Sequence, residues 1–318
     1  MSRLKGLCLV PSQRPASRTL FYLLSHTLQS SGISSLMQRD FFGSADYRTA
    51  AMISDISVNH AIKIGEFPTR SIVWWNGYES LLKYLTQCDD ATQSALRSPK
   101  TQHIFFFSVP ATAATNDGFN SVSLPYIFSI PARVPRTRRI PVAVFMAEVK
   151  PQFDSTFSES NPPSGELDHW IWQNEFRMRL GRNLLNDRAR VIFVGSDWRR
   201  AGIRALPSCY GPQTVRAFIQ SVRSVIEPGS QVGDDLWTPR LSDALANGTR
   251  CITRTRPNSP SFGIQYGRSI EHLSQLVSQA NSTRYYKSES AQIIESFRDV
   301  QKVALSGFAK IVATHHGL

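Results

Sequence analysis

Apolar residues in this chain occur in two patterns, as short continuous runs and as longer stretches with helical spacing. Runs rich in β-branched and aromatic residues predict buried strands. They cover residues 104–109, 140–149 and 190–195, and 122–131 is a further extended stretch. Apolar positions three or four residues apart predict amphipathic helices. Helices are expected over residues 20–29, 71–87, 166–185, 213–226, 269–280 and 289–315.

The run at 140–151 carries candidate chemistry, because it ends in Glu148-Val149-Lys150. Alternate residues of a strand project to the same face, so Glu148 and Lys150 project together. Both side chains are rarely buried unless they are paired or bind something. The pair suits phosphodiester chemistry, since the carboxylate can hold a divalent metal and the ammonium can offset charge on the phosphate. The alternative is a strand that emerges into solvent with two ordinary surface charges.

The charge balance favours an anionic partner. The 318 residues carry a formal net charge of +12. Such a balance indicates a polyanion, nucleic acid first and an anionic membrane second. A basic surface with no particular partner is the alternative. The hydrophobic content of 41% is enough to bury a sizeable core.

Four arginines precede the central apolar run, at Arg133, Arg136, Arg138 and Arg139, and they cluster between prolines. Four cations within seven positions can contact the phosphates of a nucleic-acid backbone. A solvated loop between two strands is the alternative.

The four cysteines lie far apart and form no Cys-x-x-Cys and no Cys/His cluster. This pattern excludes a typical zinc site and a disulfide scaffold, and it favours free thiols in a reducing compartment. We therefore expect an intracellular protein, of the nucleus or the cytoplasm. No apolar run is long enough to span a bilayer, so no transmembrane segment is expected.

Residues 1–39 contain no acidic residue, many serines and five arginines or lysines. This composition resembles a mitochondrial transit peptide, which would direct the chain to mitochondria. The alternative is a loose basic N-terminus over residues 1–19, followed by an ordinary first helix.

The order of these segments resembles the fungal PD-(D/E)XK nuclease-like domain, a divergent branch of the restriction-endonuclease-like superfamily. Trp75-Asn76 is similar to the family's helix with Glu-Ala-Ala-Trp-Asn. Residues 141–150 are similar to its strand that ends in Glu-x-Lys. Residues 167–173 are similar to its helix with Gln-Leu-Gly-x-Trp. Residues 191–198 are similar to its strand that ends in Gly-His-Asp-Trp, with Ser196 in place of the histidine.

The resemblance implies an α/β fold over residues 20–226, with a central mixed β-sheet flanked by helices, as in restriction endonucleases. The chain beyond Glu227 lies outside the resemblance. Residues 227–268 are rich in Pro, Gly, Ser and Asp and are expected to form an irregular linker. Residues 269–318 are expected to form a helical C-terminal extension.

The resemblance also implies an activity, the metal-dependent hydrolysis of phosphodiester bonds in DNA or RNA with Mg²⁺ or Mn²⁺. Glu148 would ligate the metal and orient the attacking water. Lys150 would stabilise charge on the phosphate. Asp168 or Gln173, from the following helix, would support the site, and the four arginines would hold the nucleic-acid backbone.

The chain departs from the family at two acidic positions. The helix Glu falls on Ile72, and the strand Asp falls near His103. Magnesium prefers several oxygen ligands, so Glu148 alone would hold it poorly. Asp117 is a candidate replacement ligand, and His103 is a candidate ligand for a softer metal such as Mn²⁺ or Zn²⁺.

Two other functions stay open from the sequence. The missing acids predict a catalytically inactive binding or scaffold protein that kept the nuclease fold. Without the resemblance, a basic viral nucleic-acid-binding or movement-type protein is the third reading. The sequence does not decide between an enzyme and a pseudoenzyme, nor does it give the oligomeric state.

Overall fold

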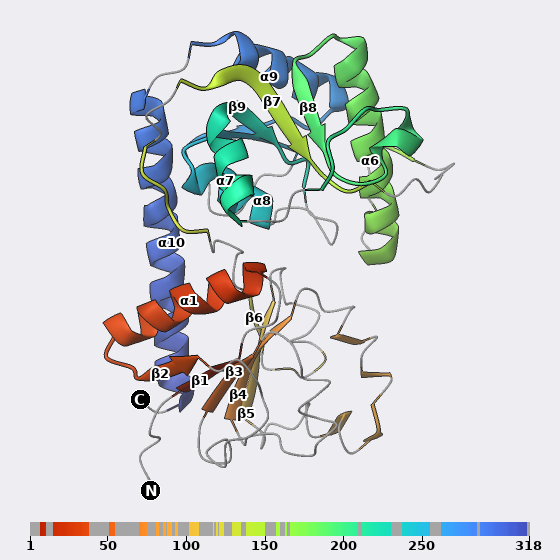
Figure 1. Cartoon of the computed structure of the whole chain (residues 1–318). Helices are drawn as coiled ribbons and strands as arrows, with labels where there is room; N and C mark the ends of the chain where they lie inside the picture. The colour runs from red at the N-terminus through yellow and green to blue at the C-terminus, as the bar shows by residue number, and fades with distance from the viewer. Residues whose placement is uncertain are drawn as a thin grey trace, which may run out of the picture. The chain divides into compact units, whose positions relative to one another are not determined.

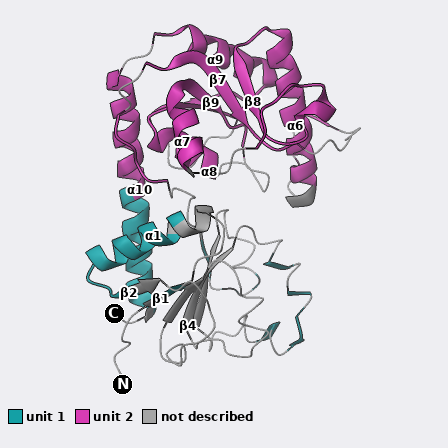
Figure 2. Ribbon diagram, viewed as in Figure 1, with its two compact units in different colours: residues 1–128, 302–318 teal, residues 129–301 magenta. Residues whose placement is uncertain are grey.

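The chain is seen in a computed structural model as two compact units, residues 1–128 with 302–318 (unit 1) and residues 129–301 (unit 2) (Figure 2). Each unit is described by itself. The structure describes residues 7–10, 15–37, 51–54, 70–75, 81–82, 85–86, 88–90, 93–94, 102–107, 117, 119, 121–123, 129–134, 138–149, 157–159, 163, 166–208, 212–229, 237–254, 262–284 and 287–316.

Unit 1 contains a six-stranded sheet with the order β2-β1-β3-β4-β5-β6, and all of its pairings are parallel. Its strands are β1 (Leu7–Val10), β2 (Ser35–Met37), β3 (Ala51–Ser54), β4 (Arg70–Trp75), β5 (Gln102–Phe107) and β6 (Ser121–Ser123). Parallel neighbours need a crossover, and helix α1 (Pro15–Ser30) supplies the one from β1 to β2.

Two helices that are far apart in the sequence form a core in unit 1. Helix α10 (Lys287–His316) belongs to this unit from Lys302 onward. Phe21 and Leu28 of α1 are fully buried together with Phe308 and Val312 of α10. The apolar stripe of the C-terminal helix is therefore used for packing within the chain.

Unit 2 contains a five-stranded sheet with the order β11-β10-β9-β7-β8, again with parallel pairings only. Its strands are β7 (Ile140–Met146), β8 (Val191–Val194), β9 (Val222–Ile226), β10 (Arg250–Thr253) and β11 (Ile264–Tyr266). The sheet is flanked by helices α6 (Glu166–Asn186), α7 (Pro212–Ser221), α8 (Pro239–Ala246) and α9 (Ile270–Ser282), and a short 3-10 helix, η2 (Trp198–Ala201), follows β8 (Figure 1).

The main core of unit 2 lies between the sheet and two of these helices. Phe145 of β7 is fully buried with Trp172 and Phe176 of α6 and with Leu273 and Val277 of α9. The last four residues of β7 are all buried, as expected for a central strand of a parallel sheet that is covered on both faces. No helix in the described part of the chain is long and apolar enough to cross a membrane.

The strands expected near 104–109, 140–149 and 190–195 are confirmed, as are the helices near 20–29, 166–185, 269–280 and 289–315. The α/β class is also confirmed. The expected mixed sheet is wrong, because every strand pairing in the two sheets is parallel.

Three local predictions need correction. The start of the helix expected at 71–87 is instead the strand Arg70–Trp75. The helix expected at 213–226 ends at Ser221, and its last five residues form β9. Residues 227–268, expected to be an irregular linker, contain α8, β10 and β11. Short β-branched runs fit both the helical and the strand periodicity of apolar positions. Pairing with strands distant in sequence decides which conformation they adopt.

Candidate functional site

The sheet of unit 2 changes its direction of growth between β7 and β9. The chain places β8 on one side of β7 and then returns to place β9 on the other side. In open parallel sheets, such a switch point leaves a crevice outside the carboxyl ends of the two strands, where ligands bind. The carboxyl ends here are Met146 of β7 and Ile226 of β9.

A buried acid directly follows β9. Glu227 exposes 6% of its surface, and its main-chain N–H donates to the carbonyl of Ile252 on β10. Its carboxylate accepts a hydrogen bond from the N–H of Gly229 at 3.4 Å. Arg177 of α6 places its Nη2 3.8 Å from Oε1 of Glu227. A carboxylate and a guanidinium are therefore buried side by side at the switch point.

Gln173 and Arg177 lie one turn apart on α6 and bind the same carbonyl. Gln173 Nε2 and Arg177 Nη2 each donate to the carbonyl oxygen of Gly229 at 3.2 Å. Arg177 Nη1 also donates to the carbonyl of Glu148 at 3.4 Å, which links α6 to the chain that leaves β7.

Two atoms of this cluster keep unused hydrogen-bonding capacity. Within the described part of the chain, Gln173 Oε1 and Arg177 Nε are buried and have no hydrogen-bond partner. A buried polar atom without a partner costs about 1–3 kcal/mol. A ligand that supplies a donor to Gln173 and an acceptor to Arg177 would recover part of that cost.

Arg254, the first residue after β10, adds a second buried cation to this edge and exposes 8% of its surface. Its Cζ lies 4.4 Å from the centre of the Trp172 ring and 5.5 Å from that of Phe176. Aromatic faces attract a guanidinium through their quadrupole. Trp172 and Phe176 occupy the row of α6 next to Gln173 and Arg177, because each pair is four residues apart.

Helix α8 contributes a third cation. The helix is capped by Thr238, whose hydroxyl accepts a hydrogen bond from the N–H of Leu241 at 3.0 Å. Arg240, its second residue, is half-buried, and its charge acts on both Arg177 and Glu227. Two arginines, Arg177 and Arg240, therefore act on the carboxylate of Glu227, and Arg254 lies at the same edge of the sheet. This balance favours an anionic ligand, and arginine suits phosphate because its planar fork donates two parallel hydrogen bonds.

Burial dominates the electrostatics of the Glu227–Arg177 pair. Burial raises the pKa of Glu227 above its usual value, while the charges of Arg177 and Arg240 act in the opposite direction. Burial lowers the pKa of Arg177, which the charge of Glu227 opposes. Arginine stays cationic in proteins, so Glu227 is the group of this pair whose charge changes with pH. In its ionised form, Glu227 only accepts hydrogen bonds, which suits a ligand with hydroxyl groups.

No cluster of three or more His, Cys, Asp or Glu side chains that would hold a metal ion occurs among the described residues. The groups gathered at the switch point are mainly cations. Cations attract negative charge, so these groups favour an anionic ligand.

Two of the catalytic residues expected from the sequence lie at this edge. Gln173 is fully buried within the cluster. Glu148 is exposed two residues beyond β7, and its carbonyl oxygen accepts from Arg177. Asp168 is exposed near the beginning of α6. Lys150 lies outside the described residues.

The three expected metal ligands do not belong to one unit. Glu148 is part of unit 2, whereas His103 and Asp117 are part of unit 1. His103 lies on β5, and its side chain is outside the described part of the structure, while Asp117 is exposed in a turn. Neither unit by itself gathers the three residues.

The four arginines expected to hold a nucleic-acid backbone have different surroundings. Arg133 and Arg138 are exposed. Arg136 lies outside the described residues. Arg139 is buried, with 1% of its surface exposed.

Arg139 binds main-chain carbonyl groups of unit 2 instead of facing solvent. Its guanidinium donates to the carbonyls of Ile219, Val222 and Asn247 at 2.9, 3.0 and 2.7 Å. These carbonyls lie at or near the ends of α7 and α8, where unpaired carbonyls and the negative end of the helix dipole favour a cation. The role expected for Arg139 is therefore corrected to a structural one.

Sequence reasoning missed the residues that form most of this cluster, which are Arg177, Glu227, Arg240 and Arg254. The available signal was the apolar run 222–226 followed by Glu227-Pro228-Gly229, a pattern typical of a buried strand and a turn. Because that run was assigned to a helix, the acid was placed at the start of a linker.

No family model matches the chain, and no curated protein sequence matches it. Similarity does appear among solved structures. One is described as the DNA-modifying enzyme β-glucosyltransferase, in the presence and absence of its substrate uridine diphosphoglucose. It has a TM-score of 0.60 and 7% sequence identity, and the match covers 98% of this chain and 100% of that one.

A second similar structure is a point mutant of the phage T4 enzyme in complex with UDP-glucose, with a TM-score of 0.57, 10% identity and the same coverage of both chains. Identities this low show the fold alone. The fold is that of these glucosyltransferase structures. The resemblance to the PD-(D/E)XK nuclease-like family is therefore wrong, and so are the nuclease, pseudonuclease and viral binding-protein functions that followed from the sequence.

Proposed function

We propose that this chain is a glycosyltransferase that binds a nucleoside-diphosphate sugar at the carboxyl edge of the unit 2 sheet. One observation carries the proposal. A buried Glu227–Arg177 pair, joined by Gln173 and flanked by Arg240 and Arg254, lies at the switch point of a parallel sheet. The similar solved structures are described with UDP-glucose, which supports this sugar nucleotide as the first donor to test.

The chemistry of such a donor divides the roles in the cluster. A diphosphate carries negative charge, and Arg240 and Arg254 supply cations that can bind it. Ribose hydroxyls donate hydrogen bonds, and the ionised Glu227 accepts them. Gln173 Oε1 and Arg177 Nε, which have no partner in the described structure, offer one further acceptor and one further donor.

Glycosyl transfer places its largest charge change on the leaving group. The bond between sugar C1 and the diphosphate oxygen breaks, while an acceptor hydroxyl bonds to C1 and loses its proton. The nucleoside diphosphate leaves with an additional negative charge. Cations fixed beside that charge stabilise the transition state more than the bound donor, and Arg240 and Arg254 would act in this way.

The release of UDP from UDP-glucose by the full chain tests this proposal. Arg240→Gln is expected to lower kcat/KM by about 10- to 100-fold, because one cation at the leaving group is lost. Arg298→Gln removes the same charge from the exposed surface of α10 and is the matched control, expected to be unchanged. A folded wild-type chain that releases no UDP from any nucleotide sugar would contradict the proposal.

The acceptor is the second part of the proposal. The net charge of +12 favours an acceptor that is a polyanion, and one similar structure is described as a DNA-modifying enzyme. We therefore propose duplex DNA as the first acceptor to assay. Labelled glucose should become attached to DNA, and the amount attached should fall as the salt concentration rises. Transfer to a neutral acceptor but not to DNA would reject this part alone.

A further inference from the structure

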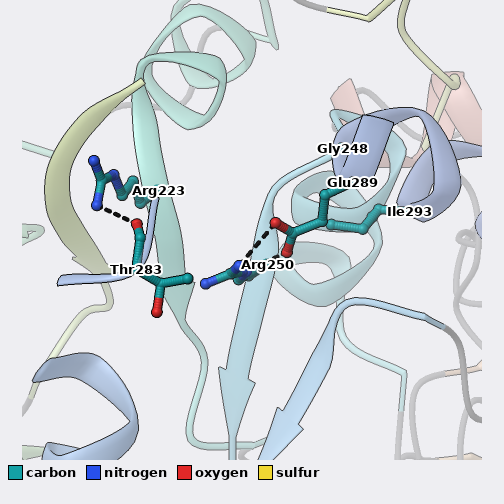
Figure 3. Close-up of a pocket in the computed structure, with 6 residues that line it drawn as sticks. All are labelled: Arg223, Gly248, Arg250, Thr283, Glu289 and Ile293. Atoms are coloured by element: carbon teal, nitrogen blue, oxygen red, sulfur yellow. Dashed lines mark hydrogen bonds and ion pairs between the residues drawn. The ribbon is translucent and has the colours of Figure 1, made fainter. Parts of the chain in front are cut away.

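A second polar pocket lies in unit 2 where its strands begin, at the edge opposite to Glu227. Arg223 is the second residue of β9 and Arg250 the first of β10, and these strands are parallel neighbours. The pocket has enclosed space for about one water molecule, and the rest of it is open to solvent. It is lined by Arg223, Gly248, Arg250, Thr283, Glu289 and Ile293 (Figure 3).

The two arginines of this pocket have different partners. Arg250 forms a bidentate pair with Glu289, in which Nη2 lies 2.7 Å from Oε2 and Nε binds Oε1. Figure 3 shows the Arg250 guanidinium directed from its strand toward Glu289 on α10. Arg223 Nη1 donates to two main-chain carbonyls at the end of α9. They belong to Asn281, at 2.7 Å, and to Thr283, the residue that follows the helix. The carboxylate is thus used by Arg250, and Arg223 binds neutral groups only.

Positive charge at this pocket is left without a counterion among the described residues. Arg223 forms no ion pair there, and its Nε has no hydrogen-bond partner. Burial lowers the pKa of Arg223, and the charges of Arg138 and Arg250 lower it further. The carbonyl end of α9 carries about half a negative elementary charge, which is less than the positive charge of Arg223 and Arg138 together.

We propose that this pocket binds a phosphoryl group, as inorganic phosphate or as the phosphate of a small monoester. Arg223 and Arg250 would donate hydrogen bonds to its oxygens, and Arg138 would supply further positive charge. Thr283 caps the end of α9 and Glu289 lies in the first turn of α10, so the anion would hold these two helices and the sheet together.

This pocket is separate from the proposed donor site. Glu227 and Arg254 follow the carboxyl ends of β9 and β10, whereas Arg223 and Arg250 lie at their beginnings. The inference does not depend on glycosyl transfer. An anion held here would stabilise unit 2 without contacting the donor.

Calorimetric titration of the full chain with inorganic phosphate, at constant ionic strength set with sodium chloride, tests the inference. Arg223→Gln is expected to weaken binding at least about tenfold, since it removes a hydrogen-bonding cation. That variant also loses the bonds to α9, so Arg138→Gln, at an exposed position, is measured beside it and is expected to bind about fivefold more weakly. Arg298→Gln, at an exposed position of α10, should bind phosphate like the wild type.

Glycerol phosphate in a parallel titration distinguishes the two sources of the phosphoryl group. Binding of both ligands supports the site for phosphate monoesters, and binding of inorganic phosphate alone supports it for the free ion. Absence of phosphate binding overturns the inference. Binding that Arg240→Gln abolishes while Arg138→Gln leaves it unchanged also overturns it, because phosphate would then occupy the proposed donor site.

Discussion

Buried arginines of unit 2 differ in what their guanidinium groups hold. Arg139 binds carbonyl groups at helix ends, Arg177 binds Glu227 and a loop carbonyl, and Arg254 lies against aromatic rings. Arg139 is held by carbonyl groups of the fold, whereas Arg177 lies beside Gln173, whose Oε1 has no hydrogen-bond partner among the described residues and is available to a ligand. The surroundings of each arginine, more than the number of arginines, separate structural from functional positions.

Replacing Arg139 by methionine should lower the free energy of unfolding by about 3 kcal/mol or more, because several buried carbonyls lose a charged donor. Urea unfolding gives this value. Arg138→Met at the neighbouring exposed position is the control and should stay within about 0.5 kcal/mol of the wild type. Equal effects of the two substitutions would show that the buried contacts of Arg139 contribute little.

The pH dependence of stability should report the burial of Glu227. Its folded pKa is raised, so the folded state holds the proton more tightly than the unfolded state. The contribution of Glu227 to the free energy of unfolding is fully present below the ordinary pKa of glutamate. It is lost as pH rises through the higher pKa of the folded state. Glu227→Gln removes this titration.

Urea unfolding of wild type and Glu227→Gln between pH 4 and pH 8 measures that effect. The stability of the wild type relative to the variant should be greatest at the acid end and should fall as pH rises. A difference that grows with pH would mean that the Arg177 charge outweighs burial and that the folded pKa of Glu227 is lowered.

At the residue scale, two residues that the sequence selected for nuclease chemistry lie beside the proposed donor site. Gln173 and Glu148 were selected from a helix and a strand end, and both lie at the switch point. Arg254 and Arg240 could not be selected, because they reach the site only through the pairing of β10 with β9 and the placement of α8. Such groups are brought together by tertiary structure and have no local pattern.

At the scale of elements, the carboxyl ends of β7 and β8 approach each other very closely. Gly195 has a φ of 140°, and a Cβ built on it would lie 1.9 Å from the carbonyl oxygen of Ala147. The same carbonyl accepts a hydrogen bond from the indole of Trp198 at 2.8 Å. Glycine at this position therefore lets the end of β8 pack beside the end of β7.

Gly195→Ala should destabilise the chain by more than about 2 kcal/mol, through the clash and the disfavoured φ. Gly307→Ala is the same substitution in α10, where a Cβ meets no neighbour within 4 Å. It should stabilise by about 0.5–1 kcal/mol, because alanine is the better helix former. Thermal unfolding of both variants checks the pair, and a Gly195→Ala chain as stable as the wild type would contradict the close approach.

Helices and strands were predicted best where a single hydrophobic periodicity extended over a long stretch or was unambiguous. The 21 residues of α6 and the apolar run of β7 were placed correctly. The apolar positions of 222–226 continue the helical spacing of α7, so the sequence alone predicts one helix through both segments. The structure ends the helix at Ser221, because Val222–Ile226 gains pairing with β7 and β10 on both sides.

At the scale of the whole molecule, two parallel sheets with different strand orders define the fold. A strand that ends in Glu-x-Lys and is followed by a helix occurs in many α/β proteins, so it could not distinguish a nuclease from this architecture. Strand order depends on pairings between residues distant in sequence, which no local pattern records. The assignment to a nuclease family failed at this scale, although most individual helices and strands were correct.

The binding of UDP to the full chain, measured by calorimetry, tests the proposed donor site most directly. We expect that the wild type binds UDP, that Arg240→Gln binds it about tenfold more weakly, and that Arg298→Gln binds it like the wild type. Wild-type protein that is folded and does not bind UDP, or equal affinities in all three proteins, would contradict a nucleotide site at the switch point of unit 2.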